Sequence, residues 1–228
     1  MPRIKGGVNR LEKARGRRAN EGVNVVSSTE PTTRIQPVAA RERLLLAAAE
    51  AFAAKGFNAT TTRDIANGAQ MSSAAVYVHF RSKEELLFEL SEAGHRIILG
   101  MIDEVDDPAV APAERLATVV GAFTEHHARE HVRARVVNYE LGSLAPDHLE
   151  TVMELRREIT RRVRAIVDAG IENGDFDVAD AQATTNAMLS MGIDVARWYR
   201  AENSLPPEEM GKFYAELATR MVGLRDRD

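Results

Sequence analysis

Residues 61–87 decide the fold, and they read TTRDIANGAQMSSAAVYVHFRSKEELL. The first segment, 61–69, opens with two threonines that can cap a short helix, and Asp64 lies near the positive end of the helix dipole. After a two-residue turn, Ser72 is placed to cap a second short helix over residues 73–79. Two short helices joined by a tight turn are typical of a helix-turn-helix, whose second helix can lie in the major groove of DNA. Periodicity alone leaves another interpretation open, because such helix pairs also occur in bundles that bind no nucleic acid.

Longer helices are predicted on both sides of this stretch. Before it, apolar residues recur at helical spacing over residues 44–52, and Gly56 is a typical residue to end that helix. After it, Ser82 and Glu85 have the spacing of a capping box, ahead of an amphipathic helix that runs to about Asp103.

The rest of the chain also follows a helical pattern, broken at proline and glycine turns, and no useful alternating strand pattern occurs. Further helices are expected at about 112–129, 131–144, 148–173, 178–201 and 206–224. The predicted fold is all-α, with an N-terminal three-helix helix-turn-helix domain and a larger C-terminal helical domain. The predicted domains are a disordered basic arm, a DNA-binding domain and a C-terminal domain, over residues 1–38, 39–90 and 91–228.

Charge and composition narrow the class of protein. Residues 1–38 carry eight Lys and Arg against three Glu, residues 39–90 are balanced, and residues 91–228 carry 16 basic against 25 acidic residues. A DNA-binding end is expected to be the less negative one. The absence of cysteine, of a long apolar run and of a signal-peptide pattern predicts a soluble, cytoplasmic protein with no membrane contact. No phosphate loop, serine elbow or carboxylate pair suggests catalysis, so neither an enzyme nor a cofactor is expected.

The residues of three segments, 61–66, 71–80 and 82–87, closely resemble the DNA-binding domain of the TetR family of regulators. The resemblance implies a homodimer that binds a palindromic double-stranded operator, usually as a repressor, and dissociates when a small-molecule effector binds. It also implies that the domain over 91–228 binds the effector and forms the dimer. Two positions depart from the family pattern: Ala74 stands where glycine is common, and Gln70 occupies a turn position that often prefers glycine.

The residue types and the resemblance together suggest roles within the helix-turn-helix. Small or apolar residues are expected to form a miniature core: Ile65, Ala66, Val76, Phe80 and Leu86. The residues expected to contact DNA are Thr62, Ser72, Ser73, Ala75, Tyr77, His79 and Lys83. For two of these residues a simpler role is also open. Ser72 can cap the helix without contacting DNA, and Ala75 can at most touch a thymine methyl group.

The helix expected over 178–201 is apolar nearly all the way round, so both of its sides must be covered. One side can face its own core and the other a partner subunit. The helix expected over 206–224 adds an apolar stripe that includes Phe213 and Leu217, and the two helices with their symmetry mates predict a four-helix dimer interface.

An effector is expected between the remaining helices, in an apolar cavity with a few polar groups. The predicted ligand-binding residues are Phe123, His127, Tyr139, Arg156, Asp194 and Trp198, and further polar candidates are His95, His131 and Asn138. Arg156 falls at the edge of an apolar stripe, so it must reach water, pair with a carboxylate such as Asp194, or await an anionic ligand. His127 and His131 have a spacing that can bind zinc, but no third ligand is evident and no metal site is predicted.

A second resemblance concerns the effector. Residues 121–139, 170–174 and 197–200 are similar to the branch of TetR regulators that controls fatty-acid or sterol breakdown and responds to acyl-CoA thioesters. It implies a small, largely apolar effector, with acyl-CoA as a candidate class.

Two questions stay open from the sequence. The segment Arg15-Gly16-Arg17-Arg18 is partly like arms that enter an A·T-rich minor groove, but it can equally be a solvated tail. The competing functional hypotheses are a regulator of the same fold that activates or needs no ligand, and a helical protein whose helix-turn-helix binds another protein.

Overall fold

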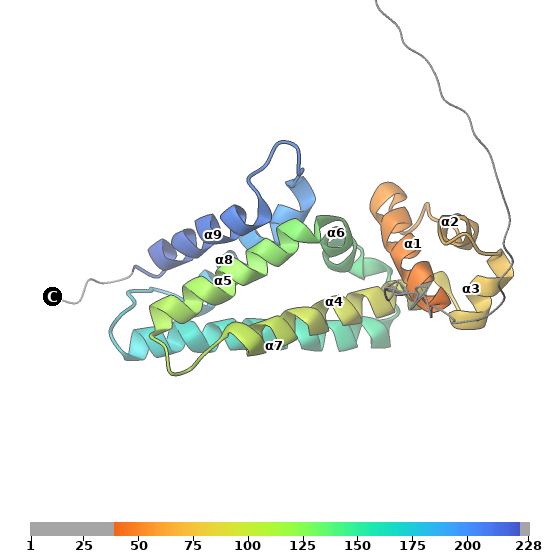
Figure 1. The fold of residues 1–228 in the computed structure, drawn as a ribbon. Coiled ribbons are helices and arrows are strands. Elements are labelled where there is room, and N and C mark those ends of the chain that lie inside the picture. The colour runs from red at the N-terminus through yellow and green to blue at the C-terminus, as the bar shows by residue number, and fades with distance from the viewer. Residues whose placement is uncertain (1–38, 224–228) are drawn as a thin grey trace, which may run out of the picture. The chain divides into compact units, whose positions relative to one another are not determined.

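The computed structural model describes residues 39–223, and the predicted basic arm over 1–38 lies outside them. The secondary structure of residues 39–223 is helical throughout, as predicted, with the chain order drawn in Figure 1. The elements are α1 (Ala40–Lys55), α2 (Thr62–Gly68), α3 (Ser73–His79), α4 (Lys83–Val105), α5 (Pro112–Arg129), α6 (His131–Tyr139), η1 (Leu141–Ser143), α7 (Pro146–Glu172), α8 (Ala181–Trp198) and α9 (Pro207–Met221).

Local signals start and stop the first helices where the sequence predicts. Gly56 ends α1 with φ 77°, a backbone conformation that favours glycine. Thr61 and Asp64 form a complete capping box at the start of α2, and the Ser72 hydroxyl accepts the Ala75 N–H at the start of α3. Gln70 adopts φ 57°, so the turn position where the family pattern prefers glycine does have a left-handed backbone.

The capping box predicted at the start of α4 forms only in part. The Ser82 hydroxyl accepts the Glu85 N–H at 3.0 Å, but the Glu85 carboxylate accepts the backbone N–H of Arg81 instead of that of Ser82. The cap on the helix is therefore present, while the reciprocal bond is displaced by one residue.

Packing holds the two short helices, because seven residues are too few for a helix to be stable alone. The predicted miniature core is confirmed: Ile65, Ala66, Val76, Phe80 and Leu86 are each at most 1% exposed. This cluster also includes Val136 and Val152 from later in the chain, and α4 passes residue 90 without a break. Residue 90, the predicted end of the DNA-binding domain, thus lies inside one continuous helix.

A second cluster fills the bundle of α4, α5, α7, α8 and α9. Glycines let its helices approach closely: a Cβ at Gly211 of α9 would lie 2.8 Å from the carbonyl oxygen of Gly121 in α5. A Cβ at Gly192 of α8 would likewise lie 2.8 Å from the ring of Phe123. Figure 1 shows α9 lying along α5, and α4 along α7.

The later helices differ from their predicted ranges at the ends. The helix expected over 178–201 starts at Ala181, because the Asp180 carboxylate caps it by accepting the Ala183 N–H at 2.9 Å. The helix expected over 131–144 ends at Tyr139, and a turn of 3-10 helix over Leu141–Ser143 replaces its last part.

Candidate functional site

The outward face of α3 consists of side chains that the fold leaves open. Val76 is fully buried, whereas Tyr77 is 59% and Val78 78% exposed, and His79 is exposed as well. Val76 thus anchors α3 to the core, and the residues that follow it face outward. Tyr77, Val78 and His79 are therefore open to a partner, and the predicted DNA contacts of Tyr77 and His79 stay predictions.

The other predicted DNA-contacting residues surround this face. The Thr62 hydroxyl, at the start of α2, lies 3.3 Å from the Tyr77 hydroxyl and joins the two helices. Ser72 is exposed and its hydroxyl serves as the cap of α3, while Ser73 and Ala75 are half-buried. Neither the cap nor the half-burial tests a contact with DNA, so these assignments stay predictions.

Lys83 takes a position that the sequence analysis missed. Its amine donates to the carbonyl oxygens of Phe57 and Thr60, at 2.6 and 2.7 Å, and lies 4.1 Å from the centre of the Phe57 ring. The side chain therefore fixes the loop between α1 and α2 in addition to any phosphate contact. No local sequence signal reveals this bond, because the partners are more than 20 residues apart.

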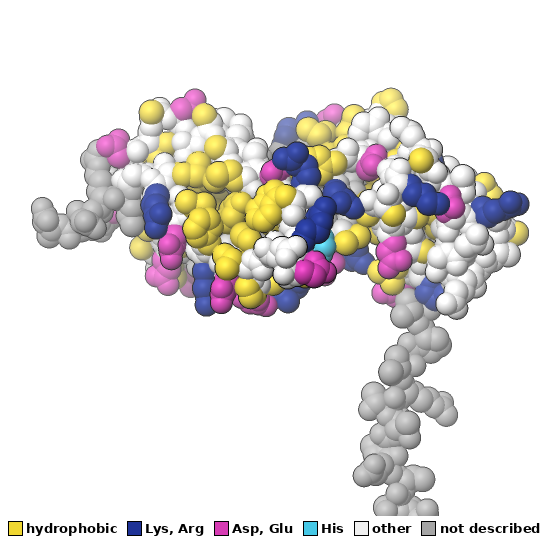
Figure 2. Space-filling model, turned by 90° about the horizontal axis from the view of Figure 1, so that it is seen from above, with side chains coloured by type: hydrophobic (Ala, Val, Ile, Leu, Met, Phe, Trp, Pro, Cys, Tyr) yellow, Lys and Arg dark blue, Asp and Glu magenta, His cyan; other side chains and the backbone are white. Residues whose placement is uncertain are grey.

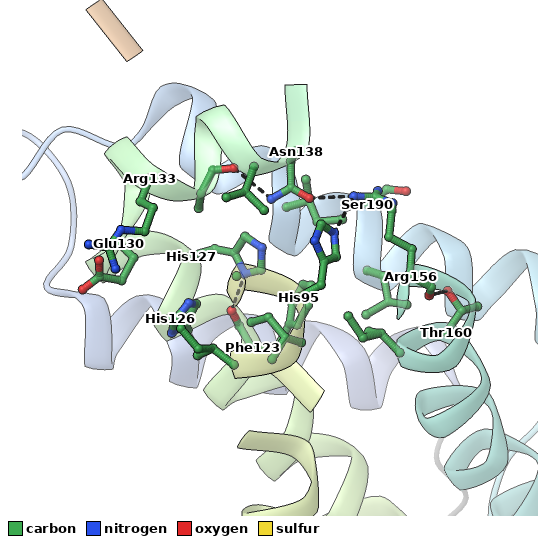
Figure 3. Close-up of a pocket in the computed structure, with 18 of the residues that line it drawn as sticks. His95, Phe123, His126, His127, Glu130, Arg133, Asn138, Arg156, Thr160 and Ser190 are labelled. Atoms are coloured by element: carbon green, nitrogen blue, oxygen red, sulfur yellow. Dashed lines mark hydrogen bonds between the residues drawn. The ribbon is translucent and has the colours of Figure 1, made fainter. Parts of the chain in front are cut away.

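A cavity of about 480 Å³ lies among α4, α5, α6, α7 and α8, and Figure 3 shows its polar residues. Its apolar lining includes Ile98, Phe123, Val137, Ile159, Leu189 and Ile193. Its polar lining includes His95, His126, His127, Arg133, Asn138, Arg156, Thr160 and Ser190. Such a mixture of an apolar wall with a few polar groups is usual for a small-molecule site.

Two buried histidines present neutral rings to this cavity. Nδ1 of His95 donates to the Ser91 carbonyl at 2.7 Å, and Nδ1 of His127 donates to the Phe123 carbonyl at 2.8 Å. Burial lowers the pKa of each ring to about 4. Since Nδ1 carries the proton, Nε2 of both histidines is left as a hydrogen-bond acceptor at neutral pH.

Arg156 crosses the polar side of the cavity and meets only neutral partners. Its Nη1 donates to Asn138 Oδ1 at 2.8 Å and to His95 Nε2 at 3.2 Å, while Asn138 in turn donates to the Ala134 carbonyl. Burial lowers the pKa of the guanidinium, the direction expected for a cation removed from water.

The structure divides the predicted ligand-binding residues between two places. Phe123, His127 and Arg156 line the cavity. Tyr139, Asp194 and Trp198 lie in a neighbouring hollow of about 520 Å³, which shares Asn138, Arg156, Ser190 and Ile193 with the cavity. Phe123 and His127 come from α5 and Arg156 from α7, whereas Tyr139 is the last residue of α6 and Asp194 and Trp198 lie on α8.

The suggested pairing of Arg156 with Asp194 is wrong for this structure. The Asp194 carboxylate accepts hydrogen bonds from Arg197 at 2.7 Å and from the Tyr139 hydroxyl at 3.0 Å. The bond with Arg197 contributes most to lowering the pKa of Asp194.

Several cavity residues were not anticipated. His126, Arg133, Thr160 and Ser190 line the cavity, yet they occupy the polar or half-exposed edges of their helices and give no signal in the sequence. Their positions depend on how α5, α6, α7 and α8 are arranged about one another. Periodicity along a single helix does not contain this information.

Among residues 39–223, no group of three or more His, Cys, Asp or Glu side chains is arranged to hold a metal ion. His127 and His131 instead use Nδ1 for backbone carbonyls. Over the same range, none of the helices combines the length and the apolar character that crossing a membrane requires.

Two family descriptions match the chain. Residues 44–90 match the "Bacterial regulatory proteins, tetR family" domain, and residues 109–222 match the "Tetracyclin repressor-like, C-terminal domain". The first range contains the helix-turn-helix, and the second contains most of the helices that surround the cavity.

Individual proteins agree with this assignment. The HTH-type transcriptional repressor KstR2 of Mycolicibacterium smegmatis is 32% identical over 191 residues, which cover 82% of this chain and 92% of the relative. The structure of a tetR-family regulatory protein from Rhodococcus RHA1 has 42% identity and a TM-score of 0.79, covering 83% of this chain and 100% of that one.

A more distant structure shares the fold. AibR, solved in complex with isovaleryl coenzyme A and operator DNA, has 18% identity and a TM-score of 0.72, covering 78% of this chain and 97% of that one. The matched domains and the repressor relatives together establish that this chain belongs to the TetR family of transcriptional regulators.

Proposed function

We propose that this protein is a ligand-responsive repressor. As a homodimer it binds a palindromic operator through α3, and it releases the operator when a small, largely apolar effector enters the cavity. Acyl-CoA thioesters are the class to test first. The observation that carries the proposal is the exposed face of α3, held at a fixed angle by a buried miniature core.

The DNA-binding part of the proposal rests on the chemistry of that face. Tyr77 and His79 are exposed and carry polar atoms suited to phosphate or base edges, and the exposed Val78 is suited to the methyl group of thymine. Lys83, Ser72 and Ser73 surround them at the starts of α4 and α3.

The effector part rests on the cavity. A volume of about 480 Å³ lies in the range of small-molecule sites, and its apolar wall suits an acyl chain. Arg133 lies on the side of the cavity away from Arg156, where it suits a phosphate of coenzyme A. AibR, with the same fold, was solved with isovaleryl coenzyme A, so the fold is compatible with a ligand of this class.

The dimer part rests on an exposed apolar surface. Trp198 of α8 is 43% exposed, Phe213 of α9 is 48% exposed, and Leu205 between them is 45% exposed. Figure 2 shows hydrophobic side chains gathered on the face seen from above, the side on which Figure 1 places α9. Contiguous apolar surface of this kind marks interaction sites.

The decisive experiment selects DNA sequences from a random duplex library with the full-length protein. A palindromic site should be enriched, and gel-shift titrations should then show dissociation of that site as acyl-CoAs of increasing chain length are added. Tyr77→Ala should lower operator affinity by about tenfold or more, because it removes a contact from the docking face. Circular dichroism should show an intact helical fold.

A matched control is Tyr199→Phe, which changes a buried tyrosine of α8's end outside the proposed DNA face. It should leave operator affinity unchanged. Enrichment of no palindrome would refute the DNA-binding proposal. An operator complex that no member of the ligand series dissociates, up to about 100 μM, would refute the acyl-CoA proposal and favour a different or ligand-independent regulator.

A further inference from the structure

Arg156 is a cation for which the fold supplies no counter-charge. Among residues 39–223 its guanidinium makes no ion pair, and its hydrogen bonds go to the neutral groups of Asn138 and His95. Burying a charge without an opposite charge is energetically unfavourable, so the presence of an arginine at this position calls for an explanation.

The structure excludes one of the other outcomes open to this side chain, the pairing with Asp194. Asp194 is engaged by Arg197 and Tyr139, so it does not neutralise Arg156. Arg156 is half-buried on the wall that the cavity shares with the neighbouring hollow, and Asn138 of α6 and His95 of α4 hold its guanidinium there.

We infer that Arg156 binds an oxyanion of the effector, a carboxylate or a phosphate, while the apolar body of the ligand lies on Ile98, Phe123 and Leu189. The inference rests on the proposed function, because it concerns the ligand of the same cavity. Arginine suits this role because its planar fork can donate two parallel hydrogen bonds to a carboxylate or phosphate.

The neutral histidines restrict where an anion can lie. Nε2 of His95 and of His127 is an acceptor, so neither ring can donate to an oxyanion from the cavity side. His127 is 3% exposed, and among the described residues no hydrogen bond to its Nε2 is formed. An anion is therefore drawn toward Arg156, and a ligand hydroxyl would be the natural partner of His127.

The test uses one acyl chain in four chemical forms. Decanoic acid carries a carboxylate, decanoyl-CoA carries phosphates, and decanoyl-N-acetylcysteamine and decanol carry no charge. Calorimetry with the full-length protein compares wild type with Arg156→Gln, Arg156→Lys and the control Arg157→Gln. Arg157 is a suitable control because it lies next to Arg156 but is exposed and pairs with Glu150 at 2.5 Å.

We expect Arg156→Gln to weaken at least one oxyanionic ligand by about tenfold or more and to change the neutral ligands by less than about twofold. Arg156→Lys should restore part of the affinity, and Arg157→Gln should have no effect. A loss confined to the free acid identifies a carboxylate as the partner of Arg156, and a loss confined to decanoyl-CoA identifies a phosphate. Equal loss of charged and neutral ligands overturns the inference, as does failure of both oxyanionic ligands to bind wild type.

A measurement without ligand gives a second, independent answer. If Arg156 awaits an anion, Arg156→Gln should leave the melting temperature of the free protein unchanged or raise it. A fall of several degrees would show that the guanidinium supports the fold and would overturn the inference. Operator binding measured on the same samples tests the proposed repressor function separately, because it requires neither Arg156 nor a ligand.

Discussion

Lys83 serves the fold before any DNA is bound. Its amine donates to two loop carbonyls, those of Phe57 and Thr60, and the side chain is half-buried as a result. Lys83 is also the first residue of α4, where free N–H groups and a cation together suit a phosphate. One residue can thus hold the loop and still contribute to the proposed DNA contact.

Replacing Lys83 by alanine should weaken binding to operator and random DNA alike and reduce the salt dependence of log K by about one unit. It should also lower the melting temperature, because two carbonyls lose their donor. Filter binding over a range of salt concentrations and thermal melts measure the two effects. Arg161→Ala, on an exposed part of α7, is the control. A lower melting temperature with an unchanged salt slope would assign Lys83 to the loop alone.

The buried histidines make stability depend on pH. Their pKa is about 4 in the folded protein and about 6.5 when unfolded, so the unfolded chain binds more protons between these values. Stability should therefore be fully present above about pH 6.5 and should fall as the pH is lowered toward 4. Each pKa unit of difference corresponds to about 1.4 kcal/mol.

Urea denaturation from pH 7.5 to 4.5 should show this loss, and His127→Gln should reduce its steepness. Arg156 and His126 also face this region, and both act in the direction that lowers the pKa of His127. The control is His79→Gln, which changes an exposed histidine of α3. An equal slope in wild type and His127→Gln would show that the pH dependence arises elsewhere.

Among the elements, α6 is in contact with both proposed functional parts. Ala134, Val137 and Asn138 face the cavity. From the same helix, Arg135 donates to the carbonyl oxygen of Ala53 in α1 at 2.6 Å, and Val136 belongs to the core cluster around α1. A ligand that shifts α6 would therefore disturb the domain that carries α3.

Removing the Arg135 bond should weaken the coupling between ligand and DNA. In Arg135→Gln, the factor by which ligand lowers operator affinity should shrink, while affinities for ligand alone and for DNA alone change less. Linkage requires the same factor when ligand affinity is measured with and without operator, so calorimetry gives an internal check. The control is Arg161→Gln, which changes an exposed arginine of α7 that does not line the cavity. An unchanged coupling factor would exclude this route.

For the whole molecule, the question is how the exposed apolar face of α8 and α9 is covered. Gly121 and Gly211 already bring α5 and α9 into close contact on the inner side, so the outer side of α9 carries Phe213 toward solvent. A second copy with the same face would cover both by two-fold symmetry.

Light scattering should give about twice the 25.1 kDa mass of one chain. Phe213→Asp should produce monomers and abolish operator binding, because a buried carboxylate would face an apolar partner surface. Leu217→Asp should act similarly, but Leu217 is half-buried and its change can also unfold the chain. The control is Ile171→Asp, since Ile171 is an exposed apolar residue near the end of α7. A wild-type monomer at micromolar concentration would refute the dimer.

By itself the sequence determined the features that depend on neighbours along the chain. Thr61, Ser72, Gly56 and the proline positions act within one helical turn, so the caps and most helix ends followed from local chemistry. The core of the helix-turn-helix was also predictable, because five small or apolar residues at helical spacing have few alternatives to burial. The family resemblance of this segment then led to the class of protein.

Only the tertiary structure decided which distant side chains meet. Arg156 bonds to Asn138 and His95, and Asp194 bonds to Arg197 and Tyr139. From the sequence, several pairings were possible for each of these arginines and carboxylates. The same holds for Lys83. The physical reason is that periodicity gives the face on which a residue lies, whereas a hydrogen bond between helices also depends on their crossing angle and relative shift.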